Sequence, residues 1–148
     1  MKNIRCQQGA TLIEIAITVL ILSTSLLAMA TLQARSLQFN KSAVLRSQAN
    51  IFAYDIIDRI RINRGDASAN ISAYTADYAV TPSGNSVATS DVSEWRANLT
   101  NALPNGKGKI RCELSTRVCS VTIQWSEEQI FGSSSADATS ELVYSSSI

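Results

Sequence analysis

An apolar stretch near the N-terminus limits what this chain can fold into more than any other feature. Residues 12–34 contain a single charged side chain, Glu14, and residues 15–34 contain none. As a helix, residues 15–34 would extend about 30 Å at roughly 1.5 Å per residue, which is the thickness of a bilayer's hydrocarbon core. We therefore expect this helix to be inserted in a membrane at some stage, with Lys2 and Arg5 holding the N-terminus on the cytoplasmic side.

A cleavable secretory signal is the alternative interpretation of this stretch. A basic start and an apolar middle are followed by Ala28-Met29-Ala30, which resembles a signal-peptidase site. Two observations count against it. A carboxylate such as Glu14 within an apolar run costs about 2.5 kcal/mol or more on insertion scales. No glycine or proline lies between residues 10 and 64, so nothing breaks the helical pattern where such a cut would fall.

A short motif precedes the apolar stretch: residues 9–15 read Gly-Ala-Thr-Leu-Ile-Glu-Ile and follow a polar leader. The motif resembles the class III signal of type IV pilins and type II secretion pseudopilins, where a prepilin peptidase cuts after the glycine and methylates the new amine. The resemblance implies cleavage between Gly9 and Ala10, methylation of Ala10, and an assembly role for Glu14, which would attract a neighbouring subunit's amine. Glycine leaves the backbone open to a peptidase, and buried opposite charges offset their desolvation only at close range. Pairing of Glu14 with its own N-terminus is the simpler alternative.

The helical pattern continues beyond residue 34, although the composition becomes polar. Apolar residues recur at spacings of 4, 3, 4 and 4, which predicts one apolar stripe, at Leu45, Ala49, Phe52, Ile56 and Ile60. Three cations precede Gly65 and suit a helix C-terminus, namely Arg59, Arg61 and Arg64. We interpret these cations as a solvated helix end in preference to a binding site. The sequence thus predicts one helix of some fifty residues.

Further stretches resemble the PilV group of minor pilins. The most specific is Asp-Arg-Ile-Arg-Ile-Asn at residues 58–63; the others are residues 95–108, with Trp and Leu-Pro-Asn-Gly-Lys-Gly, and residues 121–127. The resemblance covers most of residues 9–127. It implies the type IV pilin fold, of the α+β class, in which a long N-terminal helix, first transmembrane and then amphipathic, packs on a small antiparallel sheet. Major pilins usually have a proline near the place of Thr31, and its absence here fits a low-abundance subunit.

These patterns divide the chain into four parts. We expect a cleaved leader at residues 1–9, a transmembrane half-helix at 10–34, an amphipathic half-helix at 35–64, and a periplasmic head at 65–148. Within the head, residues 65–91 read as an irregular connection because they are rich in Ser, Thr, Asn and Ala with three turn-formers.

A short helix is expected to follow in the head. Asp91 and Glu94 form a capping-box pattern at its start, and Pro104 ends it. We interpret the Gly-Lys-Gly of residues 106–108 as a turn, since the fuller patterns of phosphate-binding loops are absent.

A β-hairpin is predicted at residues 110–114 and 117–125, where apolar residues alternate. A turn at residues 115–116 places Ile110 opposite Val121 and Cys112 opposite Cys119. Opposed Cα atoms lie about 4.5–5.5 Å apart, which permits a disulfide. In the chain-entropy model this small loop would contribute roughly 2.5 kcal/mol. We also expect a last strand at residues 141–144.

The numbers of histidine and cysteine residues limit the catalytic and metal-binding chemistry that is open to this chain. The chain has no histidine and three cysteines. The lack of histidine excludes Ser-His and Cys-His catalysis and His-ligated zinc. We expect no enzyme activity, no cofactor and no metal. Loss of residues 1–9 would remove Cys6 and leave one pair, which suits an oxidising periplasm.

Three functions remain. The resemblance implies a minor pilin in the bacterial inner membrane, with prepilin peptidase, other minor pilins, the major pilin and the pilus assembly platform as partners. A type II secretion pseudopilin shares the N-terminal features but would support secretion. A DNA-uptake or adhesive pilin is the third, because four cations surround the predicted hairpin, Lys107, Lys109, Arg111 and Arg117.

Overall fold

The structure is a computed structural model in which residues 11–64, 71–80, 86–131 and 138–148 are described. It separates into two compact units, Met1–Phe39 and Asn40–Ile148. One helix, α1 (Leu12–Asn63), supplies the described part of the first unit and the opening segment of the second. The long unbroken helix expected from the sequence is therefore confirmed.

The described part of the first unit is helical, and its side chains form no core. All side chains of residues 11–39 are exposed, and many of them are large and apolar, such as Leu27 at 70% and Leu32 at 69% exposure. The α1 helix is long and apolar enough to cross a membrane by length and composition. The structure is thus consistent with a single membrane anchor in this segment.

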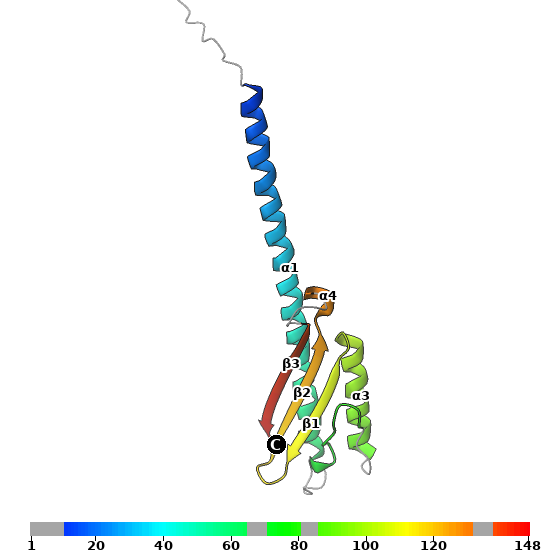
Figure 1. Cartoon of the computed structure of the whole chain (residues 1–148). Helices are drawn as coiled ribbons and strands as arrows, with labels where there is room; N and C mark the ends of the chain where they lie inside the picture. The colour runs from blue at the N-terminus through cyan, green and yellow to red at the C-terminus, as the bar shows by residue number, and fades with distance from the viewer. Residues whose placement is uncertain (1–10, 65–70, 81–85, 132–137) are drawn as a thin grey trace, which may run out of the picture. The chain divides into compact units, whose positions relative to one another are not determined.

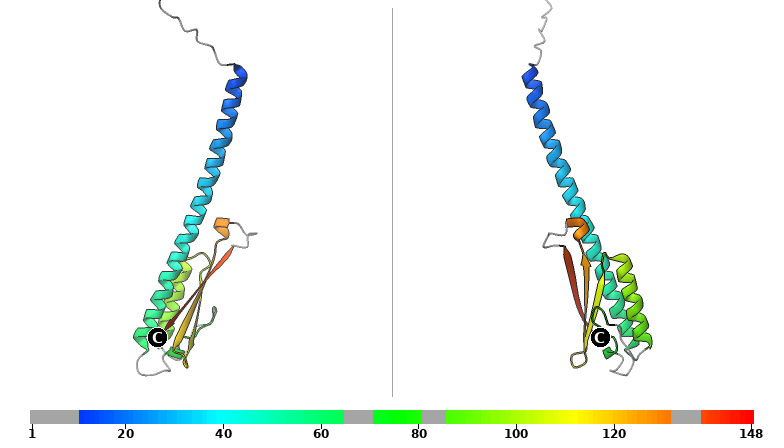
Figure 2. Two further views of the ribbon diagram at one scale, coloured as in Figure 1. Left: turned by 90° about the vertical axis from the view of Figure 1, so that its left-hand side faces the viewer. Right: turned by 45° about the vertical axis from the view of Figure 1, so that its right-hand side comes forward.

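The second unit is a two-layer α+β domain (Figures 1 and 2). One layer is an antiparallel sheet of β1 (Lys107–Glu113), β2 (Val118–Ser126) and β3 (Thr139–Ser147), in the order β1-β2-β3. The other layer is made by residues 40–63 of α1 and by α3 (Ser86–Ala102), which run side by side over one face of the sheet. A short helix, α4 (Glu128–Phe131), follows β2.

The core of the second unit lies between these layers. The predicted stripe of α1 faces inward, with Ala49, Ile56 and Ile60 wholly buried and Phe52 partly buried. The α3 helix contributes Val92, Trp95 and Leu99, and the sheet contributes Ile110, Val121 and Ile123. The indole of Trp95 donates to the carbonyl of Phe52 at 2.9 Å, so that the polar atom of this large core side chain is paired.

The predicted hairpin register is confirmed. Ile110 lies opposite Val121 and Cys112 lies opposite Cys119. The β1 strand begins three residues earlier and ends one residue earlier than expected, and β2 is shifted by one residue toward the C-terminus. The last strand is also present and longer than residues 141–144, since β3 continues through the serines at its end.

The start of α3 corrects the sequence analysis. The helix begins at Ser86, five residues before the predicted cap, so residues 86–90 are not part of an irregular connection. Asp91 is an interior helical residue whose carboxylate contacts other elements. The capping-box prediction was wrong because it rested on four neighbouring residues only. The spacing of the apolar residues in α3 begins earlier, at the buried Ala88.

Two glycines let β1 approach α3 closely. A Cβ atom on Gly106 would lie 2.5 Å from the carbonyl oxygen of Leu99, and one on Gly108 would overlap the ring of Trp95. The Gly-Lys-Gly segment therefore serves packing, with Asn105 before it in the left-handed region at φ 52°.

Candidate functional site

Glu14 lies in the first turn of α1. Its backbone N–H donates to the carbonyl of Thr11 at 3.0 Å and to the Thr11 hydroxyl at 3.4 Å. Thr11 thus caps the helix, and Thr-x-x-Glu at residues 11–14 is a capping-box pattern that the sequence analysis passed over. The carboxylate is exposed and makes no salt bridge within the part of the chain that is described. The predicted processing residues, Gly9 and Ala10, lie outside the described residues.

The apolar segment keeps its own hydroxyl groups paired. Each of five Ser and Thr side chains between residues 18 and 31 donates to a backbone carbonyl three or four residues earlier, at 2.6–2.9 Å: Thr18, Ser23, Thr24, Ser25 and Thr31. Lipid offers no hydrogen-bond partner, so internal pairing removes most of the cost of burying these groups. The segment is therefore suited to a bilayer although these five side chains are polar.

The second half of α1 also has exposed apolar side chains on its outer side, which we call the outer stripe. Val44, Ile51 and Ile62 are 56%, 62% and 86% exposed. At 3.6 residues per turn they lie within about 20° of one another on the helix, on the side away from the buried residues Ala49 and Ile56. Polar side chains share this side, since Asp55 falls between Ile51 and Ile62. The head leaves these apolar side chains uncovered.

Arg59 is not the solvated helix-end cation that we expected. Its side chain is only 25% exposed, and its guanidinium bridges Asp55 at 3.2 Å, Asp91 at 3.4 Å and Glu94 at 3.2 Å. The hydrogen bond with Glu94 raises the pKa of Arg59 and lowers the pKa of the Glu94 carboxyl. Arg59 therefore ties α1 to α3. Arg61, in contrast, is a partly exposed partner of Asp58 at 2.9 Å.

Tyr74 also belongs to this polar cluster. Its hydroxyl donates to Asp91 at 2.5 Å and accepts from the amide of Asn63 at 2.9 Å. Burial, with the hydrogen bond to Asp91, raises the pKa of Tyr74 to about 12. Sequence analysis missed the cluster because its members come from three separate segments of the chain.

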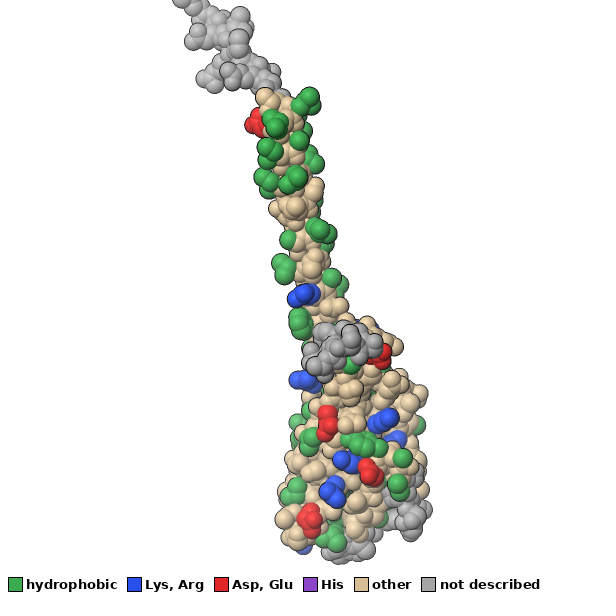
Figure 3. All heavy atoms as spheres, in the orientation of Figure 1, with side chains coloured by type: hydrophobic (Ala, Val, Ile, Leu, Met, Phe, Trp, Pro, Cys, Tyr) green, Lys and Arg blue, Asp and Glu red, His purple; other side chains and the backbone are tan. Residues whose placement is uncertain are grey.

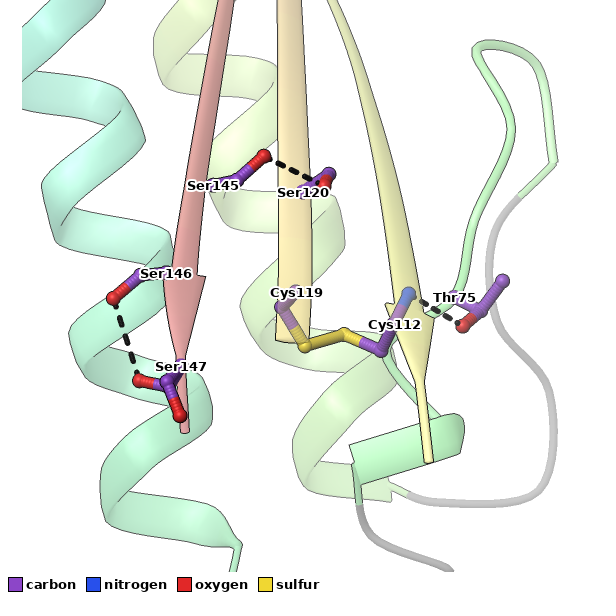
Figure 4. Close-up of a disulfide and its surroundings, with 7 residues drawn as sticks. All are labelled: Thr75, Cys112, Cys119, Ser120, Ser145, Ser146 and Ser147. Atoms are coloured by element: carbon purple, nitrogen blue, oxygen red, sulfur yellow. Dashed lines mark hydrogen bonds between the residues drawn. A yellow bond between two sulfur atoms is a disulfide. The ribbon is translucent and has the colours of Figure 1, made fainter. Parts of the chain in front are cut away.

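The two cysteines of the hairpin form a disulfide. Cys112 and Cys119 have Cα atoms 4.1 Å apart, and their sulfurs meet between the two strands (Figure 4). The backbone N–H of Cys112 also donates to the hydroxyl of Thr75 at 3.3 Å, which ties the bridge to residues 71–80. Cys119 is wholly buried, so the bridge belongs to the core.

The cations of the hairpin do not form a surface of one sign. Lys107, Lys109 and Arg111 alternate along β1 on the face away from the core, and Lys109 lies 5.0 Å above the ring of Tyr78. Acidic side chains share this face, including Glu141, which accepts from Gln124 at 2.8 Å. Figure 3 shows basic and acidic side chains interspersed on the head. A long polyanion would therefore meet repulsive charges as well as attractive ones.

No family model, curated protein or solved structure matches this chain. Within the described residues, no group of three Cys, Asp or Glu side chains is placed to hold a metal ion.

Proposed function

We propose that this protein is a minor pilin of the PilV type, which primes or modifies type IV pilus assembly as a structural subunit. The observation that carries the proposal is the α1 helix. It combines an exposed carboxylate in its first turn, an apolar segment long enough to cross a bilayer, and a second half that packs on a small α+β head.

The proposed sequence of events begins with processing. Prepilin peptidase cuts between Gly9 and Ala10 and methylates Ala10, and the chain is held in the bacterial inner membrane with its head in the periplasm. Glu14 then attracts the N-terminal amine of an adjacent pilin. Because both charges are buried in an apolar environment, they stabilise the complex only when they meet at close range, which fixes the axial position of one subunit against the next.

The outer stripe of α1 supports the same proposal. Val44, Ile51 and Ile62 offer apolar area that the head does not cover. We expect this stripe to pack against helices of other minor pilins and of the major pilin, in a complex assembled on the inner-membrane platform.

Deletion of the gene in its own bacterium tests the proposal. We expect fewer surface pili and less twitching, with recovery on expression of the wild-type chain but not of a Glu14→Ala chain present at the same level. Unchanged piliation and motility after deletion would contradict the proposal. A defect in protein secretion with normal pili would instead identify a type II secretion pseudopilin.

A further inference from the structure

The face of the sheet that turns away from α1 and α3 has a groove beside β1. Residues 75–77 lie along the outer edge of β1, where Ala76 and Ile110 exchange two hydrogen bonds of 2.9 Å. The groove between this segment and the sheet has a volume of about 450 Å³, which is the size of a small-ligand site. We call it the β1 groove. Its polar lining comes from residues 75–77, β1 and β2, namely Thr75, Asp77, Lys109, Arg111, Ser120 and Thr122.

Hydrogen bonds hold the outer wall of the β1 groove in place. The guanidinium of Arg96 on α3 donates to the backbone carbonyl of Asp77. The N–H of Tyr78 donates to the carboxylate of Asp77 at 2.8 Å, which fixes this side chain. At the other end of the wall, the N–H of Cys112 donates to the hydroxyl of Thr75 at 3.3 Å. A site that is already ordered loses little further conformational freedom when a ligand binds.

The two ends of the β1 groove differ in charge. At one end Arg111 lies opposite Ser120, so a cation stands beside a hydroxyl. At the other end, the antiparallel bridge to residues 75–77 brings Asp77 toward Lys109. The two ends are about 6.6 Å apart, since they are two residues apart along β1. Within the part of the chain that the structure describes, neither cation of the groove makes a salt bridge.

We propose that the β1 groove binds a sugar acid, with the carboxylate of the ligand at Arg111 and its hydroxyl groups at Asp77. A guanidinium only donates hydrogen bonds and pairs best with an anion, whereas an ionised carboxylate only accepts them. The ligand must therefore have an anion at one end and hydroxyl donors at the other. A neutral sugar would leave Arg111 unpaired, and Asp77 would repel a long polyanion. The site does not depend on a role in pilus assembly.

Calorimetric titration of the full-length chain in detergent micelles tests the class of ligand. Glucuronate and galacturonate are the sugar acids used as probes. Methyl glucoside offers the hydroxyl groups without the anion, and inorganic phosphate offers an anion without a sugar ring. At least one sugar acid should bind more tightly than both of these controls. Absence of binding by both sugar acids, or equal binding of either control, would overturn the proposal.

Replacing one cation at a time tests where the carboxylate binds. Arg111→Ala removes a charge-assisted hydrogen bond, so the sugar acid should bind about tenfold more weakly. Lys107→Ala is the matched control, because Lys107 is an exposed cation on the same strand and the same face that does not line the groove. It should change the affinity by less than about twofold, since the charge of an exposed side chain is screened. Similar losses in the two variants would exclude Arg111 as the anion site.

Replacing Asp77 tests the other end of the groove. Asp77→Asn keeps an oxygen that can accept from the N–H of Tyr78, so the wall is preserved. The sugar acid should bind more weakly, because its hydroxyl groups lose a charged acceptor. Inorganic phosphate should bind more tightly, because a repulsive charge is gone. A change in the same direction for both ligands would overturn the proposal.

Discussion

At the scale of single residues, the buried polar side-chain atoms in the described part of the head all have a hydrogen-bond partner. Tyr74 is wholly buried, and its hydroxyl is held between Asp91 and Asn63. Glu127 is 2% exposed, and its carboxylate accepts from the indole of Trp125 at 2.9 Å and from the hydroxyl of Ser42 at 3.0 Å. Both residues therefore contribute to stability through bonds that water cannot replace.

Tyr74 should make stability fall at high pH. Its pKa is about 12 in the fold, whereas an unfolded tyrosine ionises near pH 10. The stabilisation is present below pH 10 and is lost as pH rises through 12, because the unfolded chain releases its proton first. Urea unfolding in detergent should show this loss for the wild type and a smaller loss for Tyr74→Phe. Tyr54→Phe keeps Tyr74 and should behave as the wild type; equal pH dependence in all three chains would contradict the prediction.

Replacing Glu127 should lower the free energy of unfolding more than replacing Glu128, the acidic residue beside it. Glu127→Ala leaves the Trp125 indole buried without an acceptor, so we expect a loss of about 1–3 kcal/mol in the free energy of unfolding. Glu128→Ala, at an exposed neighbour, should change it by less than about 0.5 kcal/mol. Denaturant titrations give both values, and similar losses would be inconsistent with a specific role for Glu127.

At the scale of secondary-structure elements, the sequence predicted those parts that local pattern determines. The inward stripe of α1 and the hairpin register follow from spacing, and both are present. The role of Arg59 did not follow, because Arg59 and Asp91 come from segments more than thirty residues apart. The start of α3 was missed because the capping-box pattern was followed in preference to the apolar period that includes Ala88. The packing of Gly108 against Trp95 could not be predicted either, because the spacing of apolar residues does not indicate which segments touch.

The disulfide should stabilise the hairpin and, through it, the core. Cys112→Ala with Cys119→Ala should lower the free energy of unfolding by about 2.5 kcal/mol in the chain-entropy model, since the bridge closes a short loop. Reducing the wild type should shift its urea midpoint in the same direction. A double variant as stable as the oxidised wild type would refute this account.

The two stripes of α1 should respond differently to charge. Ile56 is wholly buried, so Ile56→Asp should unfold the head, because an unpaired carboxylate would replace a core side chain. Ile51 is 62% exposed, so Ile51→Asp should leave the circular dichroism spectrum unchanged and reduce pilus assembly. Assembly at wild-type levels in the Ile51→Asp chain would exclude the outer stripe as a packing surface.

At the scale of the whole molecule, the fold could be predicted and the function could only be proposed. The α+β arrangement is present as expected. The residues that we propose to be functional at the N-terminus would act on partners, so the structure of one chain cannot test their roles: Glu14 makes no salt bridge among the described residues. An enzyme's site can be assembled from one chain, whereas an assembly site is completed only by a neighbour.

The intact mass of the protein extracted from membranes tests the processing step. We expect a chain that begins at Ala10 and is heavier by one methyl group than the unmodified residues 10–148. Gly9→Leu should retain the full leader, since a bulky side chain hinders the peptidase at the cut. A mature chain that starts just after Ala30 would show that the apolar segment is a cleaved secretory signal.

The paired hydroxyls of the apolar segment have a mechanical consequence. Because Thr18, Ser23, Thr24, Ser25 and Thr31 bond their own backbone, none of these bonds must break when the helix exchanges lipid for protein neighbours. In the proposed pilin, the move of this helix from lipid to a filament would then change little in polar energy, and its cost would be set by apolar contacts and by Glu14. The same bonds would be kept if the helix returned to the membrane.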